Sequence, residues 1–315
     1  MENSIRIYKD SIVKYYEISI SDLVKLSSKS YKLIDNEGNE YFLKKTNYNV
    51  LEKYKFLNNQ GINNVLYPSK NKLNEFVTRK MPHAIYISKF YEDSTIIKEI
   101  KINNLFNELN NIHERTLFKR QLSPDKSRPK FEELTNRLDY KFNLLENFVR
   151  SVEAKPLNIF SMPVLANYQY LLDTKKELVR LQKRLISVIK AKESIEYSFI
   201  HNNPKIDHLL NVGGTNYLTS IDSGKIGIES LDMAKFYIEN EDINIDLSSL
   251  IMDRYKSFNP FYYDYFRFMV LIIYINRLNV TENNYANAQI FINTTNSLKK
   301  YFNNFKDIEF NDSEE

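Results

Sequence analysis

The periodicity of the apolar residues changes once along this chain, and the change limits the folds that it can adopt. From residue 22 to residue 46, short apolar runs are separated by polar residues, and residues 35–39 (DNEGN) supply turn chemistry between two of the runs. This pattern predicts an antiparallel β-meander whose third strand is 40–44 (EYFLK). Residues 1–22 are predicted to be a short helix that enters a loop.

A helix over 49–60, with strands at Glu75–Arg79 and Ala84–Phe90, would complete a small β-rich region. After Asp93 the apolar residues recur every three to four positions, which is typical of helices. The predicted helices are Ile96–Ile112, Lys130–Val152, Val164–Glu196, Leu231–Glu239, Leu247–Phe258, Phe261–Asn279 and Thr281–Phe305. Ser123–Pro129 is predicted to be a loop. The fold class is therefore α+β.

One segment interrupts the helical pattern. Phe199–Ile228 holds Pro204, four of the six glycines of the chain and two of its four histidines. A β-hairpin here would carry its loops on a rigid helical scaffold, which is a common place for a functional site. Asp222 follows a predicted strand over 216–221, and its carboxylate oxygens could hold a divalent cation.

The composition excludes several classes of function. The absence of cysteine excludes disulfides, thiolate zinc sites, iron–sulfur clusters and cysteine nucleophiles. A net charge of +4 gives no basic footprint for nucleic acid. The N-terminus lacks the apolar core of a secretory signal, and the most apolar run, Phe268–Ile275, is far shorter than the ~20 residues that span a bilayer. We therefore expect a cytoplasmic protein with no nucleic-acid partner and no membrane partner.

The order of these elements resembles the kinase-like fold of the aminoglycoside and choline phosphotransferases. The shared features are a β-meander that ends on a lysine, one helix, two strands, a helical lobe, and a histidine followed by an aspartate at a strand end. The segment 16–47 (YEISISDLVKLSSKSYKLIDNEGNEYFLKKTN) is most similar to the bacterial spore-coat kinase-like branch. The resemblance covers about residues 5–280. It implies a two-lobed fold, with an N-lobe at 1–91 and a helical C-lobe at 92–315, and it adds the spore coat as a location.

The resemblance also assigns residues to the nucleotide. Lys44 matches the strand lysine that holds the nucleotide phosphates, with Lys45 as its rival in register. Glu52 matches the helix glutamate that would pair with this lysine, and Glu75 is the alternative. ATP and Mg²⁺ are the cofactors that the resemblance implies. Asp222 matches the metal-binding aspartate, so it should lie within ~15 Å of Lys44 across a phosphate site.

The catalytic loop departs from the family pattern. His201 matches the histidine that opens this loop, and Asp232 matches a structural aspartate that steadies it. Asn203 stands at the position of the catalytic base, and His208 stands at the position of a metal-ligand asparagine. An amide cannot accept the proton of a hydroxyl, and loss of a general base typically costs ~10²–10⁴ in rate. Imidazole is a poor ligand for Mg²⁺, which prefers oxygen.

The turn between the first two strands departs as well. It reads Ser27-Ser28-Lys29-Ser30, with no glycine, so side chains stand where backbone amides should approach phosphates. Structural interpretations exist for the matching residues too: His201 as a hydrogen-bonded core residue, Asp222 as a turn aspartate and His208 as a loop residue.

We therefore predict a pseudokinase that acts as a scaffold or binding protein, with a protein partner and weak or absent nucleotide binding. The alternative is an active ATP-dependent small-molecule phosphotransferase with atypical residues, which the retained Lys44, Glu52 and Asp222 support. The acidic segment 236–246 (FYIENEDINID) would suit a cationic, aminoglycoside-like substrate, although an acidic loop between two helices is the simpler interpretation.

Overall fold

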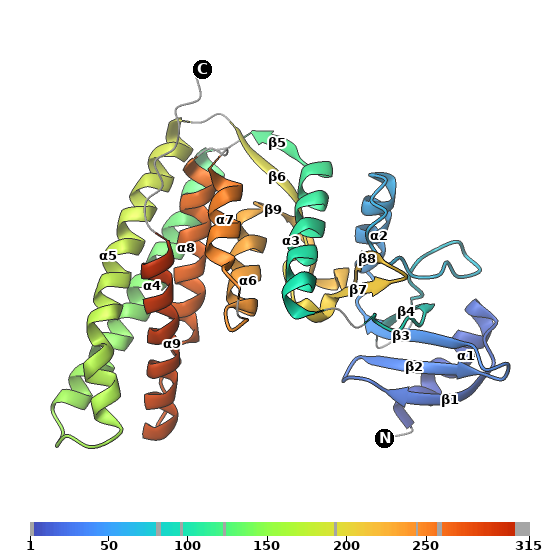
Figure 1. The fold of residues 1–315 in the computed structure, drawn as a ribbon, viewed down its shortest axis with the longest axis horizontal. Coiled ribbons are helices and arrows are strands. Elements are labelled where there is room, and N and C mark those ends of the chain that lie inside the picture. Colours follow the sequence, from blue (N-terminus) through green and yellow to red (C-terminus); the bar gives the residue numbers. More distant parts are fainter. Residues whose placement is uncertain are drawn as a thin grey trace. The chain divides into compact units, whose positions relative to one another are not determined.

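The computed structural model describes residues 3–79, 83–94, 97–121, 124–191, 194–243, 245–256 and 260–305. The chain forms two compact units, each built from two stretches of sequence (Figure 1). Unit 1 comprises Met1–Leu117 and Ser198–Ile226, and unit 2 comprises Phe118–Tyr197 and Gly227–Glu315. The two-lobe division at residue 91 stays a prediction, because each of these units combines two separate stretches of the sequence and does not divide the chain at one point.

Unit 1 is built on an antiparallel sheet with the strand order β1-β2-β3-β4. The strands are β1 (Ile20–Lys25), β2 (Ser30–Asp35), β3 (Glu40–Thr46) and β4 (Ala84–Lys89). The turn between β2 and β3 is fixed by Asp35, whose side chain accepts hydrogen bonds from the amides of Glu37 and Asn39. Gly38 adopts a φ of +83° in this turn. The predicted meander is confirmed.

The two faces of this sheet carry different partners. Successive residues of β3 point to opposite faces. Leu43 belongs to a core on one face, which includes Ile12 of α1 (Asn3–Tyr16). On the other face, Tyr86 of β4 meets Tyr54 of α2 (Val50–Asn59), with their ring centroids 5.8 Å apart. Lys44 therefore belongs to the α2 side of the sheet.

The predicted strand at Glu75–Arg79 is wrong. Only Thr78 pairs, through an isolated antiparallel bridge to Ile85. The side chain of Asn71 accepts hydrogen bonds from the amides of Leu73 and Glu75, and it thereby holds the segment in a turn. Asparagine competes with the sheet for these amides, so no strand forms.

The second stretch of unit 1 carries a short hairpin. Strands β7 (Leu209–Val212) and β8 (Thr215–Leu218) are joined by Gly213 and Gly214, which have φ of +58° and +84°. Positive φ at both turn positions is the geometry that tight hairpins favour. The 3₁₀ turn η1 (Ile206–His208) precedes the hairpin, and both pack against α3 (Lys98–Arg115). A second 3₁₀ turn, η2 (Ile221–Ser223), follows it.

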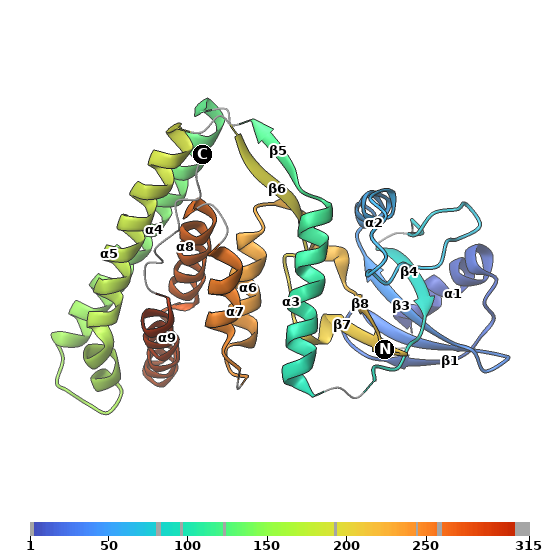
Figure 2. The same cartoon turned by 45° about the horizontal axis from the view of Figure 1, so that its top comes forward.

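Unit 2 is mainly helical. Its helices are α4 (Pro124–Glu153), α5 (Ser161–Ala191), α6 (Ser230–Asn240), α7 (Leu247–Tyr255), α8 (Pro260–Arg277) and α9 (Asn284–Asn304). Helix α5 packs along α4, α8 and α9, as Figures 1 and 2 show from two directions. A buried ion pair of 2.6 Å between Arg267 of α8 and Glu177 of α5 fixes these helices against each other. No helix in the described ranges is long and apolar enough to cross a membrane.

Two predictions in this region need correction. The predicted loop at Ser123–Pro129 is helical from Pro124 onward, while Ser123 lies outside the described residues. The predicted helix Val164–Glu196 ends at Ala191, and Ser194–Ile200 is strand β6, which pairs with an unpredicted strand β5 (Phe118–Gln121). Strand β9 (Lys225–Gly227) completes the sheet order β5-β6-β9.

Candidate functional site

Lys44 lies near the end of β3, directly opposite Ser30 of β2 and Tyr86 of β4. Its ammonium group is 2.7 Å from Oδ2 of Asp222, so the predicted proximity of these two residues is confirmed. Lys45 points to the opposite face of the sheet, with its Nζ 5.1 Å from the centre of the Tyr31 ring. Strand alternation thus selects Lys44 over Lys45 as the lysine that meets Asp222.

The carboxylate of Asp222 is fully engaged by residues of unit 1. Oδ2 accepts the hydrogen bond from Lys44 and lies 3.4 Å from the hydroxyl of Tyr86, while Oδ1 accepts a hydrogen bond from Thr46. Burial acts to raise the pKa of Asp222, but the charge of Lys44 and the hydrogen bonds from Lys44 and Thr46 outweigh it. The pKa therefore lies below its usual value, and the carboxylate is ionised at neutral pH.

The backbone around Asp222 is held on both sides. Ser220 adopts a left-handed conformation with φ of 59°, and its hydroxyl accepts a 3.2 Å hydrogen bond from Lys44. The side-chain amide of Asn202 donates to the carbonyl of Ser223 over 3.0 Å. Gly224 faces the ring of Phe199 so closely that a Cβ atom would overlap the ring. These contacts fix the position of the aspartate.

Helix α2 presents a lysine where a glutamate was predicted. Glu52 is exposed and forms a 3.3 Å ion pair with Lys55 of the same helix, so the structure does not pair it with Lys44. Glu75, the alternative, accepts a hydrogen bond of 3.2 Å from the hydroxyl of Tyr48. The residue of α2 that reaches Asp222 is Lys53, whose ammonium group donates to the Asp222 carbonyl. Lys53 and Thr46 are therefore site residues that the sequence analysis missed.

The loop at 201–208 is closed by its own histidines. His201 is 1% exposed, and its Nε2 lies 2.8 Å from the carbonyl of Thr219, as expected for a structural core residue. Nδ1 of His208 lies 2.7 Å from the carbonyl oxygen of Asn203. Burial lowers the pKa of His208 to about 4, so the imidazole is neutral at pH 7 and its Nδ1–H donates to Asn203. The His208 imidazole thus contacts the backbone of Asn203, and the side-chain amide of Asn203 takes no part in this hydrogen bond.

The turn between β1 and β2 uses its own amides. The Ser27 hydroxyl accepts hydrogen bonds from the backbone amides of Lys29 and Ser30, at 3.2 and 3.1 Å. The amide of Ser27 itself donates to the carbonyl of Ser30. The absence of glycine therefore has a structural correlate, because a serine side chain occupies donors that could otherwise bind an anion.

A cavity of about 540 Å³ lies between this turn, β3, the start of α2 and Asp222. Its lining residues are Ser28, Lys29, Lys44, Lys45, Thr46, Asn47, Val50, His83, Asp222 and Ser223. The size is that of a typical small-molecule site. Asp222 is the single carboxylate among these lining residues, and it is paired with Lys44.

The residues of this cavity do not fit Mg²⁺. Both carboxylate oxygens of Asp222 already accept hydrogen bonds, and one of the donors is an ammonium group. Mg²⁺ is usually held by carboxylate and phosphate oxygens. Within the described ranges, no group of three or more His, Asp and Glu side chains lies close enough together to hold a metal ion.

Asp232 belongs to unit 2. It lies in the first turn of α6 and is completely buried. A carboxylate in the first turn of a helix is favoured by the exposed amides there. Its predicted role of steadying the catalytic loop stays a prediction.

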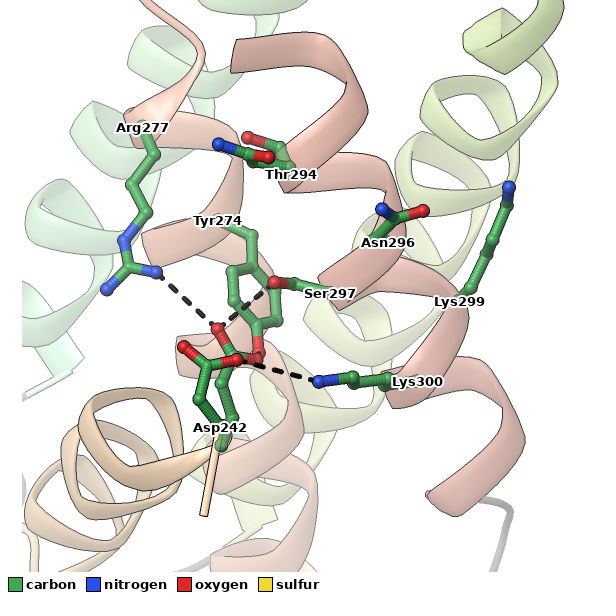
Figure 3. Close-up of a pocket in the computed structure, with 10 residues that line it drawn as sticks. Asp242, Tyr274, Arg277, Thr294, Asn296, Ser297, Lys299 and Lys300 are labelled. Carbon is green, nitrogen blue, oxygen red and sulfur yellow. Dashed lines mark hydrogen bonds and ion pairs between the residues drawn. The ribbon is translucent and has the colours of Figure 1, made fainter. Parts of the chain in front are cut away.

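The acidic segment after α6 borders a second cavity, of about 690 Å³. Figure 3 shows Tyr274 and Ser297 among the residues that line it. Both hydroxyls donate to the carboxylate of Glu241, at 2.5 and 3.0 Å. Asp246 caps α7 instead, by accepting a hydrogen bond from the amide of Ser249. These carboxylates are satisfied within unit 2, which favours the interpretation as a loop between helices over a substrate site.

Sequence comparison identifies no relative: no protein-family model matches the chain, and no curated protein matches it. Solved structures do match. An aminoglycoside phosphotransferase from Alicyclobacillus acidocaldarius subsp. acidocaldarius DSM 446 superposes with a TM-score of 0.68 at 13% identity, over 93% of this chain and 94% of its own.

Two further structures extend the comparison. Choline kinase LicA from Streptococcus pneumoniae gives a TM-score of 0.52 at 14% identity, over 95% of this chain and 100% of its own. Spectinomycin phosphotransferase, in complex with ADP and spectinomycin, gives 0.51 at 14% identity, over 94% and 97%. At such identities the likeness shows the fold alone. It confirms the predicted kinase-like fold, with an antiparallel-sheet N-terminal region and a large helical C-terminal part.

Proposed function

We propose that this protein is a pseudokinase of the aminoglycoside/choline phosphotransferase type, which binds a protein partner through a kinase-like fold and does not transfer phosphate. The observation that carries the proposal is the hydrogen bond from the neutral imidazole of His208 to the backbone carbonyl of Asn203. These two residues stand where the resemblance places a metal ligand and the catalytic base. The hydrogen bond between the His208 side chain and the Asn203 backbone lies within the loop at 201–208 and stabilises its conformation.

The chemistry of the two side chains supports this proposal. Asn203 carries an amide, which can orient a hydroxyl but cannot take its proton, and that loss costs ~10²–10⁴ in rate. His208 offers a neutral imidazole whose Nδ1 is already bonded. Because phosphoryl transfer depends on positioning and on charge neutralisation by metal ions, the poor fit of the cavity to Mg²⁺ adds to the loss.

The surroundings of Asp222 support a structural role for the remaining motif. Lys44, Thr46 and Lys53 come from β3 and α2, and all three bind Asp222 from the second stretch of unit 1. The carboxylate of Asp222, which would bind a metal ion in an enzyme, therefore stabilises the contact between the two stretches of unit 1 in this protein. A rigid scaffold of this kind suits a binding protein, including the spore-coat role that the resemblance implies.

A restorative experiment tests the proposal. We expect the wild-type protein to transfer no phosphate from ATP to aminoglycosides, choline or protein substrates, as measured with radiolabelled ATP. The double variant Asn203→Asp and His208→Asn restores the carboxylate and the oxygen ligand. Turnover that appears only in this variant supports a pseudokinase whose fold is otherwise competent. Asp207→Asn, at an exposed residue of the same loop, is the matched control.

One observation favours the alternative of an active phosphotransferase. Lys44 and Asp222 do meet, at the border of a cavity large enough for part of a nucleotide. The spectinomycin phosphotransferase of similar fold was solved in complex with ADP and spectinomycin. If the wild-type protein transfers phosphate and Asn203→Ala lowers that rate, an active enzyme with atypical residues becomes the better account.

A further inference from the structure

Strand β5 (Phe118–Gln121) forms the open edge of a small sheet and belongs to unit 2. In the strand order β5-β6-β9 it pairs with β6 alone among the described strands, and Figures 1 and 2 show it at the border of the sheet. All four of its residues are exposed. The free edge of such a strand carries backbone groups that can pair with another strand.

The backbone groups of Lys119 point toward this free edge. In an antiparallel pair, residues that bond the neighbouring strand alternate with residues that do not. Lys119 lies opposite Glu196 of β6, and the amide of Glu196 donates to the hydroxyl of Tyr262 over 2.9 Å instead of to β5. Lys119 and Glu196 are therefore a non-hydrogen-bonded pair, so the amide and carbonyl of Lys119 face the outer side of β5.

The side chains of β5 decide which kind of strand fits there. Phe118 and Arg120 share one face of the sheet, where Phe118 stacks on Tyr197 of β6 with ring centroids 6.3 Å apart. Lys119 lies on the other face. A lysine on an edge strand discourages pairing with most strands. It favours a strand that places an acidic residue beside Lys119 and an apolar residue beside Phe118.

One segment of the same chain has this alternation. Residues 307–310 read Asp-Ile-Glu-Phe, so acidic and apolar residues follow each other in turn. Alternation with a period of two is typical of a strand with one apolar face. The segment lies outside the described residues and follows Phe305, the last residue that the structure describes.

The connection to this segment is too short to bring it to β5 of the same copy. Phe305 packs against Tyr237 and Phe266, with ring centroids 4.9 and 5.1 Å apart. Only Lys306 separates Phe305 from residue 307, so the chain spans about 7 Å at most between them. Helix α8 lies between α9 and β5 in both views (Figures 1 and 2). A strand with this sequence therefore reaches β5 from another copy.

We propose that the edge of β5 binds residues 307–310 of a second copy of this chain as an additional antiparallel strand. Lys119 then lies opposite Glu309, whose carboxylate accepts a hydrogen bond from its ammonium group. Phe118 lies opposite Phe310 on the other face, and an aromatic pair across two strands is stabilising. This self-association goes beyond the proposed function and does not depend on whether the protein transfers phosphate.

The charges select this register. A shift by two residues would bring Lys306 opposite Arg120, and like charges in that position are destabilising. A shift by one residue would move the acidic residues to the face of Phe118. Because each copy offers one surface and binds a different segment of the next copy, the assembly is head-to-tail and can grow beyond a dimer. Four paired residues bury little surface, so we expect association only at high protein concentration.

The test is sedimentation velocity of the full chain at rising protein concentration in low salt. We expect species larger than the monomer to increase with concentration. Glu309→Lys should raise the concentration needed for association by about tenfold, because a favourable cross-strand charge pair becomes an unfavourable one. Glu314→Lys is the matched control, since it makes the same change of charge outside the paired segment and should leave the association unchanged.

A charge exchange separates this contact from a loss of β5 itself. Lys119→Glu should abolish the association, and the double variant Lys119→Glu with Glu309→Lys should restore it. Three outcomes overturn the inference: a monomer at every concentration, equal effects of Glu309→Lys and Glu314→Lys, or a double variant that does not recover. Circular dichroism of each variant confirms that it is folded. Phosphate transfer by the wild-type protein would contradict the proposed function alone.

Discussion

The side chains of Lys44 and Asp222 meet at 2.7 Å although 178 residues separate them in sequence. Lys44 comes from the central part of the sheet, and Asp222 comes from the turn η2, which follows the hairpin β7–β8. Thr46 and Lys53 bind the same aspartate from β3 and α2. Asp222 is therefore one of the residues that join the two stretches of unit 1 through polar contacts, besides Leu218 and Asn211.

Asp222→Asn should destabilise the protein. The amide keeps the size of the side chain but leaves Lys44 without a carboxylate, and we expect a loss of about 1–3 kcal/mol in the free energy of unfolding. Urea denaturation measures this loss. Asp207→Asn, at an exposed position, should stay within about 0.5 kcal/mol of the wild type. Equal effects of the two changes would contradict the structural role of Asp222.

The same ion pair has a pH dependence of known sign. The pKa of Asp222 in the folded protein lies below its usual value. The ionised Asp222 therefore contributes fully to the free energy of unfolding above its pKa of ~4 in the unfolded chain. This contribution is lost as the pH falls through the pKa of Asp222 in the folded protein. In strongly acidic solution, the free energy of unfolding of Asp222→Asn should therefore approach that of the wild type.

His208 should make stability rise with pH over a different range. Burial lowers its pKa from 6.5 to about 4, so between these values the unfolded chain binds a proton that the folded chain does not. Stability from the neutral imidazole is complete above pH 6.5 and is lost as the pH falls toward 4. His208→Asn should flatten the dependence of the melting temperature on pH over this range. Identical slopes in wild type and His208→Asn would show that His208 titrates normally.

Gly224→Ala should destabilise unit 1 by packing alone. Gly224 has φ of −58°, which any residue tolerates, but a Cβ atom there would overlap the ring of Phe199. Such overpacking typically costs 1–3 kcal/mol. The double variant with Phe199→Leu should recover part of the loss, because the ring is removed. Denaturation of the four proteins in a double-mutant cycle measures the coupling, and a value near zero would refute the steric explanation.

Tyr274→Phe should destabilise unit 2. The Tyr274 hydroxyl donates a 2.5 Å hydrogen bond to Glu241, whose side chain is 9% exposed. A buried carboxylate that loses a donor costs about 1–3 kcal/mol. Tyr285→Phe is the matched control, since Tyr285 is 62% exposed. Chemical denaturation decides between this internal role for Glu241 and a surface role, for which the two variants would behave alike.

The sheet and Lys44 could be predicted because strand alternation leaves few choices. The run at 40–46 puts Phe42, Lys44 and Thr46 on one face, and a single register decides which lysine meets Asp222. The alternation of apolar and polar residues in the strands also made the kinase-like order of elements predictable. Thr46 could have been found from this alternation, since it follows Lys44 on the same face.

Glu52 was predicted as the partner of Lys44 from the resemblance alone, and the apolar pattern of the helix was not applied to this choice. The buried residues of α2 are Val50, Leu51, Tyr54 and Leu57. At 100° per residue, these positions place Glu52 opposite the apolar face and Lys53 at its flank. The apolar pattern alone therefore pointed to Lys53 as the residue of α2 nearest to the interior.

The start of α4 was missed through the weight given to proline. Pro124 occupies the first helical position, where its fixed φ and missing N–H are favourable. The two prolines of residues 123–129 instead suggested a loop. Strand β5 had no signal of its own, because all four of its residues are exposed and it forms only by pairing with β6.

The division of unit 1 into two stretches has a consequence for synthesis of the chain. Leu218 bridges to Val65, and its amide and carbonyl bond Asn64 and Leu66. These partners are made long before Leu218 leaves the ribosome, because all of residues 118–197 must be translated in between. During synthesis, the side of the sheet that carries Lys44 and α2 therefore lacks its contacts with residues 198–226 until those residues are made. A chain that ends before residue 226 leaves this side of the sheet exposed to chaperones and to proteases.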